Sequence, residues 1–182
     1  ETKYRISGNA DSGFVHFEAI SRRGTRSPKS VTPSDKGIIF VATDGVFTTN
    51  LIGPDTKISG KIEALFSEED VNGEEHINFD EAEQISAAYF KSKYYFCYCA
   101  GTATTPNRMA VFGFDNEEWA IYDHEGSSML VEADIDYLTL GGNDGFLYRI
   151  EDGVTDDGVA ISAEARTKDF AGGSYNSRNL FL

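Results

Sequence analysis

Histidines and cysteines are the first residues to test for chemistry, because they ligate metals and act as acids, bases and nucleophiles. The three histidines, His16, His76 and His124, stand far apart in the sequence, and none belongs to a His-Glu-x-x-His pattern. Cys97 and Cys99 stand two residues apart on an expected strand, so their side chains face the same side. Because the sequence offers no further pair of ligands at zinc spacing, we interpret them as buried thiols. The sequence therefore predicts no metal site and no cofactor.

Acidic clusters offer a second kind of chemistry, since glycosidases work with two carboxylates. The chain has 30 Asp and Glu residues, so some close pair is inevitable and pairs alone carry no weight. Asp123-His124-Glu125 is interpreted as a polar loop after a strand. Asp134-x-Asp136 and Asp156-Asp157-Gly158 resemble fragments of calcium-binding loops, but neither continues into the oxygen-rich pattern, and both are interpreted as turns. The sequence also lacks a nucleophile elbow and a phosphate-binding loop. We expect no catalytic residue.

The composition limits both the fold and the partners. The 182 residues carry 30 acidic and 16 basic side chains, which gives a net charge of −14. That balance argues against tight binding of nucleic acid, whose affinity depends on Lys and Arg, and against a polybasic membrane surface. The longest uncharged run, residues 94–107, is too short and too polar to span a membrane. Nine Tyr, 13 Phe and 18 Gly with only four Pro favour strands joined by glycine turns, an all-β composition.

Most of the chain is predicted to form strands, and these strands would position any functional site. Runs rich in Val, Ile, Phe and Tyr, bounded by Gly, Asn, Asp or Ser, predict strands at 37–42, 45–49, 86–90, 94–99, 108–114, 118–122, 137–140 and 146–150. Helical spacing of apolar residues appears at 56–66, with a weaker candidate at 80–88. We expect Phe40, Phe47, Phe96, Phe112, Trp119 and Leu147 in the core.

Two Asp-Gly pairs mark the clearest turns between these strands. Asp44-Gly45 and Asp144-Gly145 each stand between apolar runs, which predicts hairpins with type I′ turns, whose two central residues both have positive φ. These four residues are expected to form the structural turns of the two hairpins. Residues 91–93 and 115–117 are polar breaks of the same kind. Hairpin following hairpin predicts an antiparallel meander.

The meander divides into groups of the size of β-propeller blades. The groups span 30–50, 86–122 and 128–152, with a leftover strand at 14–20 and an insertion at about 51–84 that holds the helical stretch. We therefore expect propeller blades over 1–154 and an exit strand or a further β-module over 155–182. Propellers close with about four to eight blades, and this chain supplies three to four. We expect an incomplete propeller in part of a longer protein; a sandwich or barrel is the alternative.

Residues 33–40 resemble the Asp-box of sialidase-type propellers. Asp35, Gly37 and Phe40 match the Asp, Gly and aromatic positions, whereas Pro33 replaces the leading serine. In that family the box holds a blade turn and is not catalytic. The resemblance therefore supports the fold and leaves activity open.

A second resemblance covers most of the chain and rests on short phrases in a fixed order. The first group is Phe17-Glu18-Ala19-Ile20 with residues 24–31 and 37–47; the second is 58–63; the third is 148–153 with 155–161 and 166–170. This order is similar to that in virion proteins of tailed bacteriophages that carry a β-propeller at the head–tail neck or in the tail, including accessory proteins of the DNA-stabilisation type.

The resemblance implies a non-enzymatic structural component of a phage particle, made in the bacterial cytoplasm. It implies other virion proteins as partners and a homo-oligomeric ring around the DNA path, with no membrane contact. A net charge of −14 suits a surface along which DNA slides without binding tightly. The alternative is a carbohydrate-binding or glycosidase-type propeller, with Tyr89, Tyr94, Trp119 and Tyr122 stacking on sugars. A deep pocket with two carboxylates about 5–9 Å apart would favour that alternative.

Overall fold

The computed structural model describes residues 4–18, 23–70, 75–132, 134, 136–153, 155–156 and 159–160. The chain divides into two compact units, Glu1–Glu151 and Asp152–Leu182, where the sequence suggested a boundary after residue 154. In the second unit, the short strands β14 (Thr155–Asp156) and β15 (Val159–Ala160) pair antiparallel. Residues 161–182, most of the expected exit strand or further module, lie outside the described residues.

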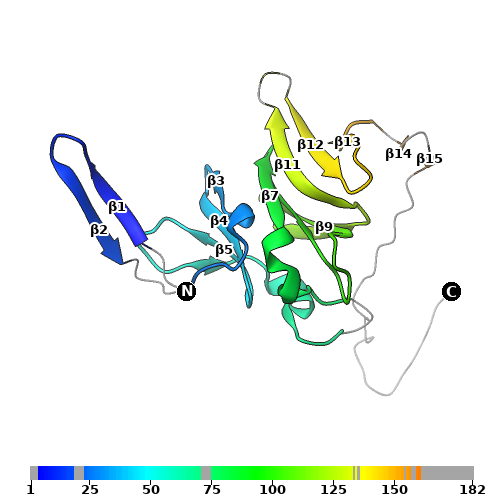
Figure 1. Cartoon of the computed structure of the whole chain (residues 1–182), viewed down its shortest axis with the longest axis horizontal. Helices are drawn as coiled ribbons and strands as arrows, with labels where there is room; N and C mark the ends of the chain where they lie inside the picture. The colour runs from blue at the N-terminus through cyan, green and yellow to red at the C-terminus, as the bar shows by residue number, and fades with distance from the viewer. Residues whose placement is uncertain are drawn as a thin grey trace, which may run out of the picture. The chain divides into compact units, whose positions relative to one another are not determined.

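Three antiparallel sheets follow one another along the first unit, and in each the sequential strands are neighbours (Figure 1). The first sheet consists of β3 (Thr32–Ser34), β4 (Gly37–Ala42), β5 (Gly45–Thr49) and β6 (Thr56–Lys57). The second consists of β7 (Ser86–Phe90), β8 (Lys93–Tyr98), β9 (Arg108–Gly113) and β10 (Glu118–Tyr122). The third consists of β11 (Gly126–Glu132), β12 (Tyr137–Gly142) and β13 (Leu147–Ile150). A separate hairpin, β1 (Tyr4–Asn9) and β2 (Gly13–Glu18), precedes them.

The all-β prediction is confirmed by these strands. The strands expected at 37–42, 45–49, 86–90 and 118–122 are found with the same bounds, and four others differ by one or two residues at their ends. Strand β2 covers most of the expected 14–20, whose last two residues lie outside the described ones. The described strands form open sheets, and none of these sheets closes on itself, so the propeller is not confirmed.

Short 3₁₀ helices, η1 (Pro28–Ser30), η2 (Gly60–Phe66) and η3 (Phe79–Gln84), connect the sheets. The helix expected at 56–66 therefore begins only at Gly60, because Thr56 and Lys57 extend the first sheet as β6. The helix expected at 80–88 ends at Gln84, and β7 begins at Ser86. No described helix is long and apolar enough to cross a membrane.

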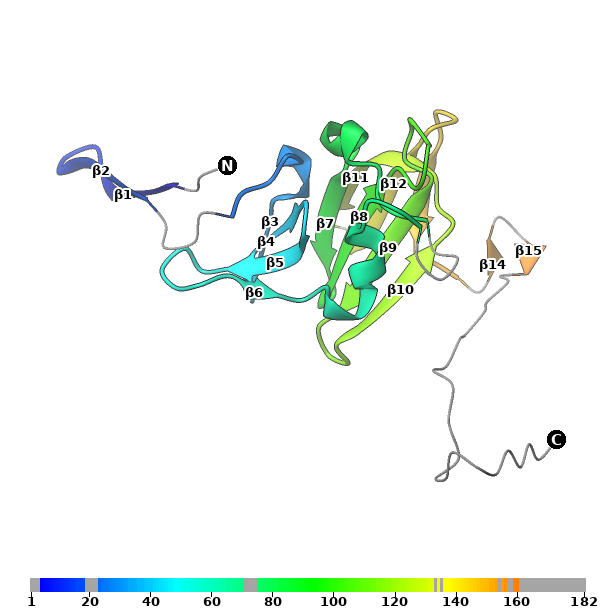
Figure 2. The same cartoon turned by 90° about the horizontal axis from the view of Figure 1, so that it is seen from below.

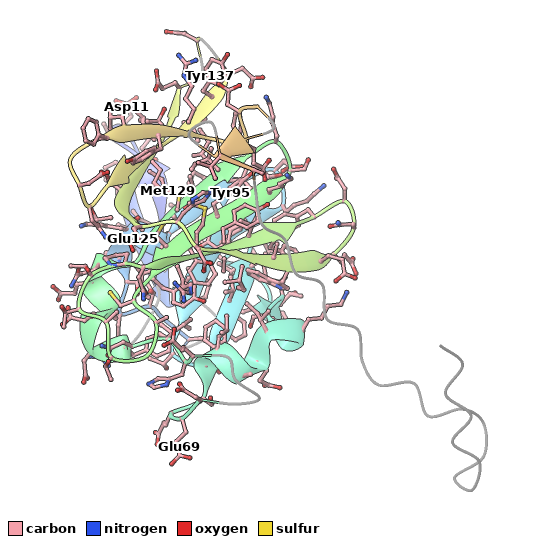
Figure 3. All side chains as sticks on the ribbon, turned by 90° about the vertical axis from the view of Figure 1, so that its right-hand side faces the viewer. Asp11, Glu69, Tyr95, Glu125, Met129 and Tyr137 are labelled. Atoms are coloured by element: carbon pink, nitrogen blue, oxygen red, sulfur yellow. The ribbon has the colours of Figure 1, made fainter. Side chains whose placement is uncertain are left out.

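The second sheet is buried on both faces, and its strand β8 shows why. Tyr94, Phe96 and Tyr98 point to the first core, which lies between the first and second sheets, while Tyr95 and Cys97 point to the second core, between the second and third. All five are at most 1% exposed. A strand covered on both sides has apolar residues at successive positions, which matches the sequence of β8. Figure 3 shows Tyr95 and Met129 close together in the second core.

Most of the expected core aromatics are confirmed, and one expected core residue is wrong. Phe40, Phe47, Phe96 and Phe112 are buried, and Trp119 packs partly buried against the first core. Leu147, by contrast, is 77% exposed. It pairs with Gly141 on β12 and so lies on the face of the third sheet opposite Leu138 and Leu140, which line the second core. Leu147 is an apolar strand residue, as expected, but it lies on the solvent-exposed face of the third sheet and not on the face that lines the second core.

The turns differ in type from those expected. At Asp144-Gly145, only the glycine has positive φ (+88°), and its N–H donates to the oxygen of Gly142 over 3.2 Å, which is a type I turn followed by a glycine bulge. At Asp44-Gly45, again only the glycine has positive φ (+147°). Two consecutive positive φ values occur instead at Lys91 and Ser92, between β7 and β8.

Candidate functional site

The two cysteines are buried thiols in the structure. Burial raises the pKa of Cys97 to about 12. Burial, together with the negative charge of Glu81, raises the pKa of Cys99 to about 11. A thiol is a nucleophile or metal ligand only as the thiolate, so neither residue is activated for chemistry. Across the described residues, no three His, Cys, Asp or Glu side chains come together as a metal site would require.

Among the described side chains, His76, His124 and Asp123 do not form one site. His76 Nδ1 lies 2.7 Å from an oxygen of Asp70, and this hydrogen bond lowers the pKa of that carboxyl. His124 packs edge-on against Tyr122, with 5.7 Å between the ring centroids. Asp123 lies 3.3 Å from Nε of Arg108 and forms an exposed ion pair. The side chain of the third histidine lies outside the described residues.

The other acidic fragments are found in, or near, turns. Asp136 forms a 2.8 Å ion pair with Lys91, which joins the loop before β12 to the turn between β7 and β8. Asp134 is exposed in the same loop. Of the third fragment, Asp156 is the last residue of β14, and residues 157–158 lie outside the described part of the chain.

The aromatics named for sugar stacking are distributed between the two cores. Tyr94 is fully buried, so the expectation that it would stack on a ligand is wrong. The indole N–H of Trp119 donates to the backbone oxygen of Ile58 over 3.0 Å. Tyr89 donates to Asp35, and Tyr122 packs against the second core. These four side chains do not converge on one surface.

The Asp-box-like turn joins two sheets. The residues Asp35 and Lys36 form the loop between β3 and β4, where Ser34 Oγ accepts from the N–H of Lys36 and donates to the oxygen of Gly37. The hydroxyl of Tyr89 in the second sheet donates to Asp35, and this bond lowers the pKa of the carboxyl. The turn therefore has a structural contact between the first and second sheets.

A cleft of about 460 Å³ lies between the first and second sheets. Its lining comes from the β3–β4 turn, β5, β6, η2 and the β9–β10 hairpin: Lys36, Thr48, Thr56, Lys57, Ile58, Gly60, Lys61, Phe112, Phe114 and Glu117. Figure 2 shows η2 passing from the β6 edge of the first sheet toward β10 of the second. Glu117 is the one carboxylate in this lining, so the cleft lacks the pair of carboxylates that a glycosidase needs.

Three lysines border this cleft, each beside a carboxylate. Lys57 Nζ lies 2.7 Å from Glu63, and Lys61 Nζ lies 2.6 Å from Glu118. Lys36 forms a longer pair, 3.1 Å, with its neighbour Asp35. These lysines do not stand out in the sequence. They are separated by up to 25 positions and by a change of element, and neither spacing nor composition marks them as a group.

The outer face of the third sheet is a second feature of the surface. We use this name for the face that lies opposite the second core, formed by Ser128, Leu130, Glu132, Tyr137, Thr139, Gly141, Leu147 and Arg149. Leu130 is 61% exposed and Leu147 is 77% exposed. The guanidinium of Arg149 stacks over the ring of Tyr137 at 4.3 Å, and Thr139 donates to Glu132 over 2.6 Å.

The chain was compared with protein-family models and with curated protein sequences, and neither comparison gave a match.

Proposed function

We propose that this chain is a non-enzymatic structural component of a tailed-phage virion, built from propeller-like blades, that works by assembling with copies of itself and with other virion proteins. The observation that supports this most directly is the pair of exposed leucines, Leu130 and Leu147, on the outer face of the third sheet. The other sheet faces in the stack are covered: the second sheet has a core on each side, and Phe40 and Phe47 on the first sheet are buried.

The polar groups on the outer face also suit an interface. Thr139 and Glu132 are bonded to one another, and Arg149 is stacked on Tyr137. Polar groups that are already paired within one protein lose little when a second protein covers them, whereas unpaired groups would have to find partners. Tyr137 and Arg149, beside the two exposed leucines, belong to the residue types enriched in interface centres and hot spots.

The test is the mass of the native assembly in solution. The double variant Leu130→Lys with Leu147→Lys places two charges on the outer face and is expected to yield monomers. The matched control is Ile52→Lys, because Ile52 is also apolar and 63% exposed but lies in the β5–β6 loop. If the protein is monomeric before any substitution, or if control and double variant dissociate alike, assembly through this face is wrong.

The virion assignment has its own test. Phage particles purified from the organism that encodes this protein are expected to contain several copies of the protein each. Quantitative mass spectrometry of the particles measures the copy number. Absence of the protein from the particles would overturn the assignment. The charge hypothesis predicts in addition that the assembly does not retain DNA at low salt, because a net charge of −14 repels phosphates. Tight retention with a steep dependence on salt would contradict that hypothesis.

A further inference from the structure

The lysine-bordered cleft between the first and second sheets is separate from the outer face of the third sheet. It exists because the first core ends there. Along the inner face of the first sheet, Ile39, Val41 and Val46 pack against the second sheet, but Thr48 on β5 and Thr56 on β6, which pair with one another, carry hydroxyls instead. A cleft of about 460 Å³ remains beside these hydroxyls, with Ile58 and Phe114 at the margin of the first core.

The size and lining of the cleft match a small-molecule site. Ligand sites commonly have volumes of roughly 300–1,000 Å³, with apolar walls and a few polar groups that fix orientation. Phe112 and Phe114 supply the apolar wall, with their rings edge to face at 4.8 Å. Thr48 and Thr56 supply hydroxyls, which both donate and accept hydrogen bonds.

The lining of the cleft contains more basic than acidic side chains, although the whole chain is acidic. Of 16 basic residues in a chain of net charge −14, three border this one cleft, with a single carboxylate, Glu117, in the lining. The ion pairs of Lys36, Lys57 and Lys61 are with exposed carboxylates, and such pairs are worth about 0–1 kcal/mol. An ammonium has three donors, so Lys57, which donates to Glu63, and Lys61, which donates to Glu118 and to the backbone oxygen of Glu117, each keep a donor for a ligand.

We propose that this cleft binds an anionic sugar unit, in which a carboxylate or phosphate meets the lysines and the apolar C–H face of the ring packs on Phe114, which Phe112 supports from the core. The ammonium groups of Lys57 and Lys61 receive the negative charge, and the hydroxyls of the two threonines pair with sugar hydroxyls. A neutral sugar lacks the charged contact, and a simple anion lacks the contact with the aromatic wall, so both bind more weakly.

The protein contains its own reporter for this binding. Trp119 is the one tryptophan of the chain; its ring lies 4.9 Å from that of Phe112, and its N–H is bonded to Ile58, which also lines the cleft. Titration of the full chain with D-glucuronate, glucose 6-phosphate, glucose and inorganic phosphate is therefore followed by tryptophan fluorescence, with calorimetry as a second readout.

The expected order is binding of glucuronate and glucose 6-phosphate at least about tenfold tighter than glucose and inorganic phosphate. A tenfold difference corresponds to about 1.4 kcal/mol. Preference for one anionic sugar over the other identifies the carboxylate or the phosphate as the group recognised. Inorganic phosphate that binds as tightly as glucose 6-phosphate would overturn the sugar part of the proposal, and glucose that binds as tightly as glucuronate would overturn the anionic part.

Variants separate the cleft from the rest of the surface. Lys57→Gln with Lys61→Gln removes two charges and is expected to weaken glucuronate binding at least about tenfold, as is Phe114→Ala. Lys91→Gln is the control, since Lys91 is a half-exposed, ion-paired lysine that does not line the cleft. A urea unfolding curve for each variant shows that it is folded. Folded variants that bind as the unsubstituted chain does would overturn the proposal.

Discussion

The hydroxyl of Tyr94, in the second sheet, donates a 2.8 Å hydrogen bond to the backbone oxygen of Ser30, which ends η1 just before the first sheet. Both residues are fully buried, and 64 positions separate them. The same serine also fixes β4, because its Oγ accepts from the N–H of Val41 over 3.1 Å. A polar contact inside an otherwise apolar core specifies one arrangement of the two sheets, since a shifted arrangement would leave these groups unpaired.

Removal of that hydroxyl is the first prediction. Tyr94→Phe leaves the ring in place and deprives the Ser30 oxygen of its donor; the 3.5 Å contact from Thr32 is too long to replace it. We expect a loss of about 1–2 kcal/mol in the free energy of unfolding, measured by urea titration. Tyr137→Phe is the control, because it keeps the ring under Arg149, and its effect is expected within about 0.5 kcal/mol. Equal effects of the two substitutions would contradict the assigned role.

The second prediction concerns alkaline pH. Burial raises the pKa of Tyr94 above its ordinary value, and burial together with the charge of Glu151 does the same for Tyr95. The unfolded chain then releases these protons from about pH 10 upward while the folded chain keeps them, so the stability is complete below that pH and falls above it. The slope from each tyrosine rises with pH toward a limit of about 1.4 kcal/mol per pH unit, reached above about pH 11. Urea titrations between about pH 8 and 11 measure the slope, which becomes shallower in Tyr94→Phe; parallel curves would refute the assignment.

The strands could be predicted where apolar runs end at strong turn residues. Strands β4 and β5 follow from the sequence because Gly37, Asp44 and Gly45 bound them clearly. The type of turn could not be predicted, because Lys91 and Ser92 have no intrinsic preference for positive φ, and their turn is set by the pairing of Phe90 with Lys93.

Features that depend on how whole sheets pack against one another could not be predicted from the sequence. The exposure of Leu147 depends on which face of the third sheet meets the second, and the local pattern around it does not decide this. The cleft lysines, Lys36, Lys57 and Lys61, meet Phe112 and Phe114 only because two meanders stack face to face. A pattern search over one window detects neither feature.

The third prediction is that alanine substitution destabilises the protein more at Gly45 than at Gly145, although both glycines have positive φ. A Cβ on Gly45 would lie 2.6 Å from Ser59 Oγ, which accepts from the N–H of Val46, whereas a Cβ on Gly145 would have no neighbour within 4 Å. Gly145→Ala therefore costs backbone strain of about 1 kcal/mol, and Gly45→Ala costs about 2–3 kcal/mol because strain and a steric clash combine. The midpoints of thermal unfolding are the measurement. Gly60→Ala, which has neither positive φ nor a clash, is the control and is expected to be neutral or slightly stabilising. An order in which Gly145→Ala is the more harmful would contradict the geometry of these turns.

The fourth prediction is that the cysteines do not react while the protein is folded. Burial raises the pKa of Cys97 to about 12 and that of Cys99 to about 11, so at about pH 8 almost none of either thiol is ionised, and no reagent reaches them. A thiol-specific chromogenic reagent is expected to modify neither in the native protein and both in concentrated guanidinium chloride. Leu130→Cys supplies the positive control, since that position is 61% exposed and its thiol is expected to react rapidly under native conditions. If the native cysteines react as fast as this added thiol, β8 is not enclosed between two cores, and the order of the sheets is wrong.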